Sequence, residues 1–172
     1  MTRSTWTTGR TRRLKAGLAT AGLATALLTA LPAASASADD TPHLWNKGAG
    51  LCLNVQGYSS SASARTEIWN CLDQNAEKWV FNSDGTVRNA QSGLCLNVAG
   101  YSKDWGGRTE IWDCNGNAAE QWQLRSDGTL LNTNSSLCLN VVNNAIGTSS
   151  ATEIWGCDGR TSEQWVKFQL PG

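Results

Sequence analysis

The cysteines of this chain recur at a constant interval, and the interval governs the rest of the sequence. Two series run 43 residues apart: Cys52, Cys95, Cys138 and Cys71, Cys114, Cys157. The same shift superimposes the run Leu-Cys-Leu-Asn-Val at 51–55, 94–98 and 137–141 without an insertion. A period of this length marks supersecondary units that pack against one another. The sequence therefore predicts three copies of one unit, at approximately residues 44–88, 89–131 and 132–172.

Residues 1–38 have the order of a bacterial-type secretory signal peptide. A basic head precedes the apolar run 16–31 and an Ala36-Ser37-Ala38 cleavage signal; its basic residues are Arg3, Arg10, Arg12, Arg13 and Lys15. A transmembrane anchor is the alternative, but this run is short and rich in Ala, Gly and Thr. We expect cleavage after Ala38 and a secreted domain over residues 39–172. Both the Sec and the twin-arginine routes stay open.

The charge balance of residues 39–172 limits the partners. Nine basic residues face fourteen acidic ones, a net charge of −5. Nucleic-acid backbones are bound by clustered Lys and Arg, and anionic membranes attract basic segments. We therefore expect neither nucleic acid nor a membrane as a partner of the mature domain, which we expect to be a monomer.

An even number of cysteines in an exported chain indicates disulfide bonds. Six cysteines allow fifteen pairings in principle. The repeat favours pairing within each copy: Cys52–Cys71, Cys95–Cys114 and Cys138–Cys157. Zinc binding is the alternative, but no CxxC pair or nearby His completes a zinc site. We expect no metal and no cofactor.

Short β-strands are the dominant local signal. Leu51, Leu53 and Val55 alternate with polar or small residues, and segments 66–69 and 79–81 are rich in β-forming residues. Asp-Gly pairs at 84–85 and 127–128 predict hairpin turns. Each unit supplies about four strands, so three units closing around an axis predict an all-β fold. The third copy ends before its own Asp-Gly turn, and residues 41–46 could supply its missing closing strand.

The order Cys-Leu-x-Val, Ile-Trp-x-Cys and a Trp eight residues after the second Cys resembles the ricin B-type lectin domain. That family includes the family 13 carbohydrate-binding modules. The resemblance covers about residues 43–170 and implies a β-trefoil fold. It constrains the ligand less, because this fold hosts many functions.

The resemblance also implies a shallow sugar pocket in each repeat. The Trp of Ile-Trp stacks on the sugar, because an aromatic face suits the C–H groups of a sugar ring. These residues are Trp69, Trp112 and Trp155. The last Trp of each unit is expected in the core: Trp79, Trp122 and Trp165.

The polar residues depart from the family pattern identically in all three copies. Asn54, Asn97 and Asn140 replace its Asp, and Glu67, Glu110 and Glu153 replace its Gln. Its Asn-Gln pair becomes Ala76-Glu77, Ala119-Glu120 and Ser162-Glu163. Acid and amide have exchanged places, so we expect each amide to be braced by the later glutamate: Asn54–Glu77, Asn97–Glu120 and Asn140–Glu163.

Two interpretations follow from this exchange. Up to three weak pockets bind sugar and together hold a polysaccharide, or the pockets are silent. We favour binding, because every copy keeps a Trp beside polar residues. Tyr58 and Tyr101 occupy a loop position that is Asn144 in the third copy. Trp105 could extend the second pocket or fold over the barrel end. We expect the second site to be strongest and the third weakest.

Catalysis and protein binding are the rival functions. The only histidine, His43, lies at the domain edge, and no Ser–His or Cys–His arrangement or phosphate-binding loop is present. We therefore expect a non-enzymatic protein. A protein-binding or structural β-trefoil with silent pockets would instead use one distinctive loop, and residues 103–107 are the candidate.

Overall fold

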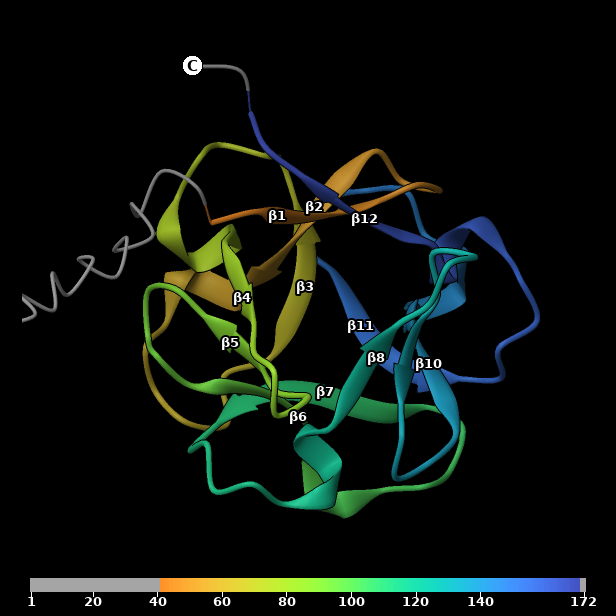
Figure 1. Ribbon diagram of the computed structural model, residues 1–172. Helices are drawn as coiled ribbons and strands as arrows, with labels where there is room; N and C mark the ends of the chain where they lie inside the picture. The colour runs from red at the N-terminus through yellow and green to blue at the C-terminus, as the bar shows by residue number, and fades with distance from the viewer. Residues whose placement is uncertain (1–40, 171–172) are drawn as a thin grey trace, which may run out of the picture. The chain divides into compact units, whose positions relative to one another are not determined.

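The computed structural model describes residues 41–170 (Figure 1). The predicted signal peptide lies outside the described residues. The described part contains twelve strands: β1 (His43–Asn46), β2 (Leu51–Val55), β3 (Thr66–Trp69), β4 (Trp79–Phe81), β5 (Val87–Asn89), β6 (Cys95–Val98), β7 (Gly107–Trp112), β8 (Trp122–Leu124), β9 (Leu130–Asn132), β10 (Leu137–Val141), β11 (Ser150–Trp155) and β12 (Trp165–Phe168). Six 3-10 helices connect them: η2 (Gln56–Tyr58), η3 (Asn75–Glu77), η4 (Ala99–Tyr101), η5 (Ala118–Glu120), η6 (Val142–Asn144) and η7 (Thr161–Glu163).

The three repeats are built on the same two kinds of antiparallel hairpin. The first pairs β2 with β3, β6 with β7 and β10 with β11 in one register, in which each first cysteine lies opposite the Trp of Ile-Trp. The second pairs β4 with β5 and β8 with β9 through the predicted Asp-Gly turns. The expected four strands per unit and the expected all-β trefoil are confirmed.

The second hairpin of the third repeat is completed by the start of the domain. In β1, His43 to Asn46 pair antiparallel with Phe168 to Trp165 of β12. Figure 1 shows β1, in orange, beside β12, in blue. The sequence expectation for residues 41–46 is therefore confirmed, and the domain is closed by joining its two ends.

A ring of three threonine hydroxyls lies at the junction of the repeats. Strands β3, β7 and β11 contact one another in pairs. The buried Oγ1 atoms of Thr66, Thr109 and Thr152 lie 2.7 Å apart in all three combinations. Because a hydroxyl both donates and accepts, the three close a cyclic hydrogen-bond ring.

The core is built from equivalent residues of the three repeats. Leucine, valine and isoleucine side chains of the first hairpins pack with the last tryptophan of each unit. The indole Nε1 of Trp79, Trp122 and Trp165 donates to a buried backbone carbonyl at 2.9 Å in every copy. These tryptophans are core residues, as expected.

One disulfide fastens each first hairpin to the loop that follows it. The bonds are Cys52–Cys71, Cys95–Cys114 and Cys138–Cys157, as the repeat predicted. In each case the first cysteine is buried in the strand. The disulfide therefore holds the loop against the strand pair that carries the candidate site residues.

Candidate functional site

Strand register gathers an aromatic and two polar side chains in each repeat. In the first repeat Asn54 lies directly opposite Glu67 across β2 and β3. Trp69 follows Glu67 by two residues, so the two side chains leave the same face of the strand. The second and third repeats reproduce this geometry. The three tryptophans are half-buried, whereas the three asparagines are buried.

The amide of each asparagine is held by the glutamate on the facing strand. Asn54 Nδ2 donates to Glu67 Oε1 at 3.3 Å, and Asn97 Nδ2 donates to Glu110 Oε1 at 3.3 Å. The third repeat has the same bond, from Asn140 to Glu153, at 3.1 Å. The expected Asn54–Glu77, Asn97–Glu120 and Asn140–Glu163 pairings are therefore wrong for this donor, because the facing carboxylate accepts it.

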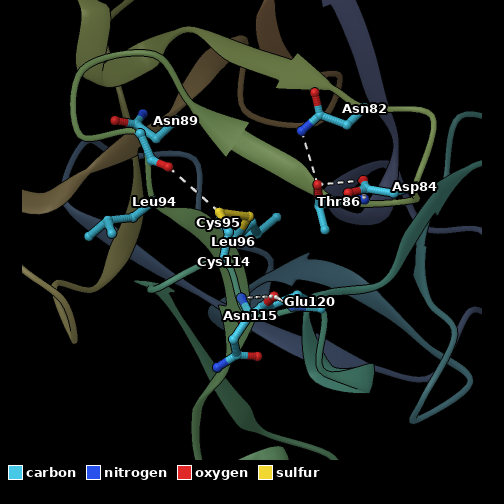
Figure 2. The surroundings of a disulfide bond; sticks show 12 residues. Asn82, Asp84, Thr86, Asn89, Leu94, Cys95, Leu96, Cys114, Asn115 and Glu120 are labelled. Atoms are coloured by element: carbon cyan, nitrogen blue, oxygen red, sulfur yellow. Dashed lines mark hydrogen bonds between the residues drawn. A yellow bond between two sulfur atoms is a disulfide. The ribbon is translucent and has the colours of Figure 1, made fainter.

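The later glutamates lie beneath the site and hold a loop. Glu77, Glu120 and Glu163 are fully buried. Figure 2 shows Glu120 next to the Cys95–Cys114 disulfide, where its Oε2 accepts the backbone N–H of Asn115 at 3.2 Å. Glu77 and Glu163 accept backbone N–H groups in the same way. Burial raises the pKa of all three carboxyls. In the second repeat, Asn117 Nδ2 donates to Glu120 Oε1 at 2.6 Å, so this glutamate supports a residue that lines the depression.

The second repeat carries the larger of two depressions that coincide with these residues. It has a volume of about 260 Å³ and is lined by Asn97, Gly100, Tyr101, Glu110, Trp112 and Asn117. Tyr101 reaches the rim because Gly100 and Tyr101 both adopt positive φ, of 61° and 56°. A left-handed tyrosine is uncommon in proteins, and such backbone outliers concentrate at functional sites.

The third repeat has a smaller and more polar depression. Its volume is about 170 Å³, and its lining residues are Asn140, Asn143, Asn144, Glu153, Trp155 and Arg160. Ser162 Oγ donates to Asn144 Oδ1 at 2.7 Å, so the polar pair replaces the tyrosine and alanine of the other repeats. Tyr58 takes the corresponding position in the first repeat and is exposed.

The facing glutamates differ in their electrostatic surroundings. Arg108 Nη2 lies 2.7 Å from Glu110 Oε2, so the carboxylate of the second site has a positive charge beside it. The equivalent position is Arg65 in the first repeat and Ala151 in the third. Burial raises the pKa of Glu67 and Glu153, and hydrogen bonds from Asn54 and Asn140 oppose that rise. The second site thus presents the most firmly compensated carboxylate.

Trp105 belongs beside the third site and not the second. Its ring centroid lies 4.9 Å from that of Trp155. Of the two expected placements of Trp105, the one that extends the second pocket is therefore wrong. The loop 103–107 contacts the third repeat through Trp105 and through the bond from the Gly106 N–H to the Ile154 carbonyl. The 43-residue period alone does not reveal this contact.

Sequence reasoning missed several lining residues. Asn117 and Arg160 occupy one repeat position, which is Gln74 in the first copy. Gly100 and Asn143 likewise share a position. A comparison of the copies could have found the first of these, because its residue type changes while the surrounding scaffold is constant.

Among residues 41–170 no three His, Cys, Asp or Glu side chains are grouped so as to hold a metal ion. The same range contains no helix long and apolar enough to cross a bilayer. His43 is buried, with Nε2 3.7 Å from Asp73 Oδ1 and 3.8 Å from Glu77 Oε2. Burial lowers its pKa.

The fold and the threefold recurrence of an Asn, a Glu and a Trp define a β-trefoil protein with one candidate site in each repeat. The model of the ricin-type beta-trefoil lectin domain matches residues 41–165. The chain belongs to this family, as its repeat motifs led us to expect. No curated protein matches the sequence.

Solved structures with the same fold include single domains and parts of longer chains. The designed threefold-symmetric protein ThreeFoil has a TM-score of 0.71 and 23% identity, covering 75% of this chain and 98% of its own. The exo-beta-1,3-galactanase 1,3Gal43A from Clostridium thermocellum has a TM-score of 0.69 and 23% identity, and the match covers 77% of this chain and 31% of the galactanase chain. The agglutinin from Abrus precatorius has a TM-score of 0.65 and 26% identity, and the match covers 74% of this chain and 47% of the agglutinin chain. This chain thus spans less than half of the latter two chains.

Proposed function

We propose that this domain is a secreted lectin module that binds saccharides at up to three repeated sites. The observation that carries the proposal is the depression of the second repeat. There the ring of Trp112 borders a hollow that also presents the amide of Asn97 and the carboxylate of Glu110. An aromatic face suits the C–H side of a sugar ring, while amides and carboxylates bond its hydroxyls.

The recurrence of the same Asn, Glu and Trp set in all three repeats supports a polymeric ligand. The depressions of the second and third repeats measure only about 260 and 170 Å³, so each contact with a sugar is expected to be weak. Binding of one repeat raises the effective concentration of a polysaccharide at the other two, which strengthens overall attachment without new contacts. The signal-peptide pattern of residues 1–38 supports a role outside the cell, on extracellular polysaccharide.

Retention on a polysaccharide panel tests the proposal. The mature domain is run through native gels that contain neutral, acidic or amino-sugar polysaccharides, and its retardation is compared with that of Trp69→Ala/Trp112→Ala/Trp155→Ala. We expect the wild type to be retarded by at least one polymer and the triple variant to migrate freely. Val80→Ala/Val166→Ala, which changes exposed apolar residues of the second hairpins, is the control and should behave as wild type.

Two outcomes would contradict the proposal. Equal retardation of the wild type and the triple variant would remove the tryptophan sites from the interaction. Free migration of the wild type in every gel would favour a protein-binding or structural β-trefoil with silent pockets.

A further inference from the structure

Each site is bordered by a loop of the preceding repeat. Three equivalent hydrogen bonds of 2.9 Å join them: Ser63 N–H to Ile111 O, Gly106 N–H to Ile154 O and Ser149 N–H to Ile68 O. Every acceptor is the residue just before a candidate stacking tryptophan. The residues before the donors are Ala62, Trp105 and Thr148. The third site is therefore the one of the three that has an aromatic side chain, Trp105, at this border.

Trp105 makes an angled contact with the tryptophan of the third site. The centroids of Trp105 and Trp155 are 4.9 Å apart and their planes are inclined by 47°. Trp105 nevertheless stays 63% exposed. The depression of the third site does not include Trp105 among its lining residues. The ring therefore widens the aromatic surface beside the hollow and leaves the hollow open.

The neighbouring sequence makes room for this ring. A Cβ atom at Gly156 would lie 3.1 Å from Cζ2 of Trp105, closer than ordinary van der Waals contact. The equivalent positions in the other repeats are Asn70 and Asp113. Trp105 in the second repeat thus occurs together with Gly156 in the third. Both residues differ from those at the equivalent positions of the other copies.

We propose that Trp105 and Trp155 form one binding platform for two consecutive pyranose rings of a glycan chain. Trp155 stacks one sugar beside Asn140 and Glu153, and Trp105 stacks the next. The inclination of the two rings suits a chain that bends between its units. The inference rests on the proposed lectin function. It reverses the expected order of the sites for oligosaccharides, because the third site gains a second aromatic face.

The test isolates the third site and varies the length of the ligand. In Trp69→Ala/Trp112→Ala, calorimetry measures binding of the mono-, di- and trisaccharides released from the polymer that retards the wild type. Trp105→Ala is then added. We expect affinity for the di- and trisaccharide to fall roughly three- to tenfold, as for loss of one aromatic contact, and monosaccharide affinity to stay within about twofold. Trp105→Phe should restore most of the loss, and Val166→Ala serves as the matched control.

The second site offers a gain-of-function variant. In Trp69→Ala/Trp155→Ala, the pair Ala62→Trp/Asp113→Gly transplants the two departures of the third site to the second. We expect its preference for disaccharide over monosaccharide to rise by a similar factor. Thermal unfolding of every variant shows that the domain is folded.

The outcomes separate the two proposals. Suppose that the wild type binds a polymer, but Trp105→Ala lowers the affinity for mono- and oligosaccharides equally or leaves both affinities unchanged. The two-ring platform is then overturned and the lectin function stands. If the wild type binds no saccharide, the lectin function fails and the platform fails with it.

Discussion

At the scale of single residues, each asparagine donates a hydrogen bond to the glutamate on the facing strand, which is buried in the first two repeats and half-buried in the third. Asn140 lies directly opposite Glu153 and donates to it at 3.1 Å. In Asn140→Asp two carboxylates would face each other across the strands, which removes the donor and adds like-charge repulsion. We expect a loss of about 1–3 kcal/mol in unfolding free energy at pH 7.

The second repeat supplies the comparison for this variant. In Asn97→Asp, Arg108 Nη2 already lies 2.7 Å from Glu110 Oε2 and partly compensates the new charge. The loss is therefore expected to be smaller than for Asn140→Asp in urea unfolding at pH 7. The loss for Asn140→Asp should shrink as the pH falls, because a proton on either carboxyl of that pair removes the repulsion. A larger loss for Asn97→Asp would contradict the assigned role of Arg108.

Glu163 links a buried carboxyl to the pH dependence of stability. Burial and the neighbouring Asp158 raise its pKa above the ordinary value. Hydrogen bonds from backbone N–H groups and the positive charge of Arg160 oppose this rise. A raised pKa means that the folded state holds the proton more tightly than the unfolded state. This stabilisation is complete below the unfolded pKa of about 4.3 and is lost as the pH rises through the folded pKa.

Glu163→Gln removes the titration while its amide oxygen still accepts from the backbone of Asp158 and Gly159. Glu163 Oε1 has no hydrogen-bond partner within residues 41–170, so an amide N–H there takes the place of an uncompensated oxygen. We expect the melting temperature of the variant, relative to wild type, to increase from pH 4 to pH 7. The exposed change Asp113→Asn is the control. A pH-independent difference would show that Glu163 does not titrate in this way.

The sequence predicted which residues approach one another better than which atoms bond. The family resemblance placed Asn54 and Glu67 in one pocket, and the structure brings them together across β2 and β3. The brace to Glu77 followed from the family pattern, in which an amide donates to an acid. Once acid and amide are exchanged, the donor sits on Asn54, and the carboxylate on the facing strand competes for it.

At the scale of elements, the first hairpin of each repeat and its disulfide form the smallest unit that holds a site. The cysteines are 19 residues apart in all three copies. Closing such a loop removes unfolded-state entropy worth about 3 kcal/mol. We expect Cys95→Ser/Cys114→Ser to lose roughly this amount in urea unfolding. Cys52→Ser/Cys71→Ser should lose a similar amount, and a loss confined to one repeat would contradict an entropic origin.

Loop placement is the part of the element scale that the sequence did not reveal. The 43-residue period shows that Ala62, Trp105 and Thr148 are equivalent, but equivalence does not say which repeat a loop contacts. That contact arises when the three units pack together. The backbone N–H of Gly106 then donates to the carbonyl of Ile154, the residue before Trp155. The pairing of residues 41–46 with the third repeat was predictable, because residues 132–170 contain no equivalent of the Asp-Gly hairpin turns at 84–85 and 127–128.

At the scale of the whole molecule, the threonine ring is the feature that involves all three repeats at once. Thr66, Thr109 and Thr152 satisfy one another, each donating one hydrogen bond and accepting one. Thr109→Val leaves two hydroxyls that cannot both donate within the ring. One buried donor then loses its partner, which costs about 1–3 kcal/mol.

Replacing all three threonines tests whether the ring acts as a unit. In Thr66→Val/Thr109→Val/Thr152→Val no hydroxyl remains to be satisfied, and three methyl groups meet at a site where all three side chains are buried. Removal of every partner of a buried network is nearly neutral compared with removal of one. We therefore expect the triple variant to lose less unfolding free energy than the sum of the three single variants, measured by urea unfolding. Additive losses would mean that each threonine stabilises its own repeat, and that the three copies meet at the axis without being coupled there.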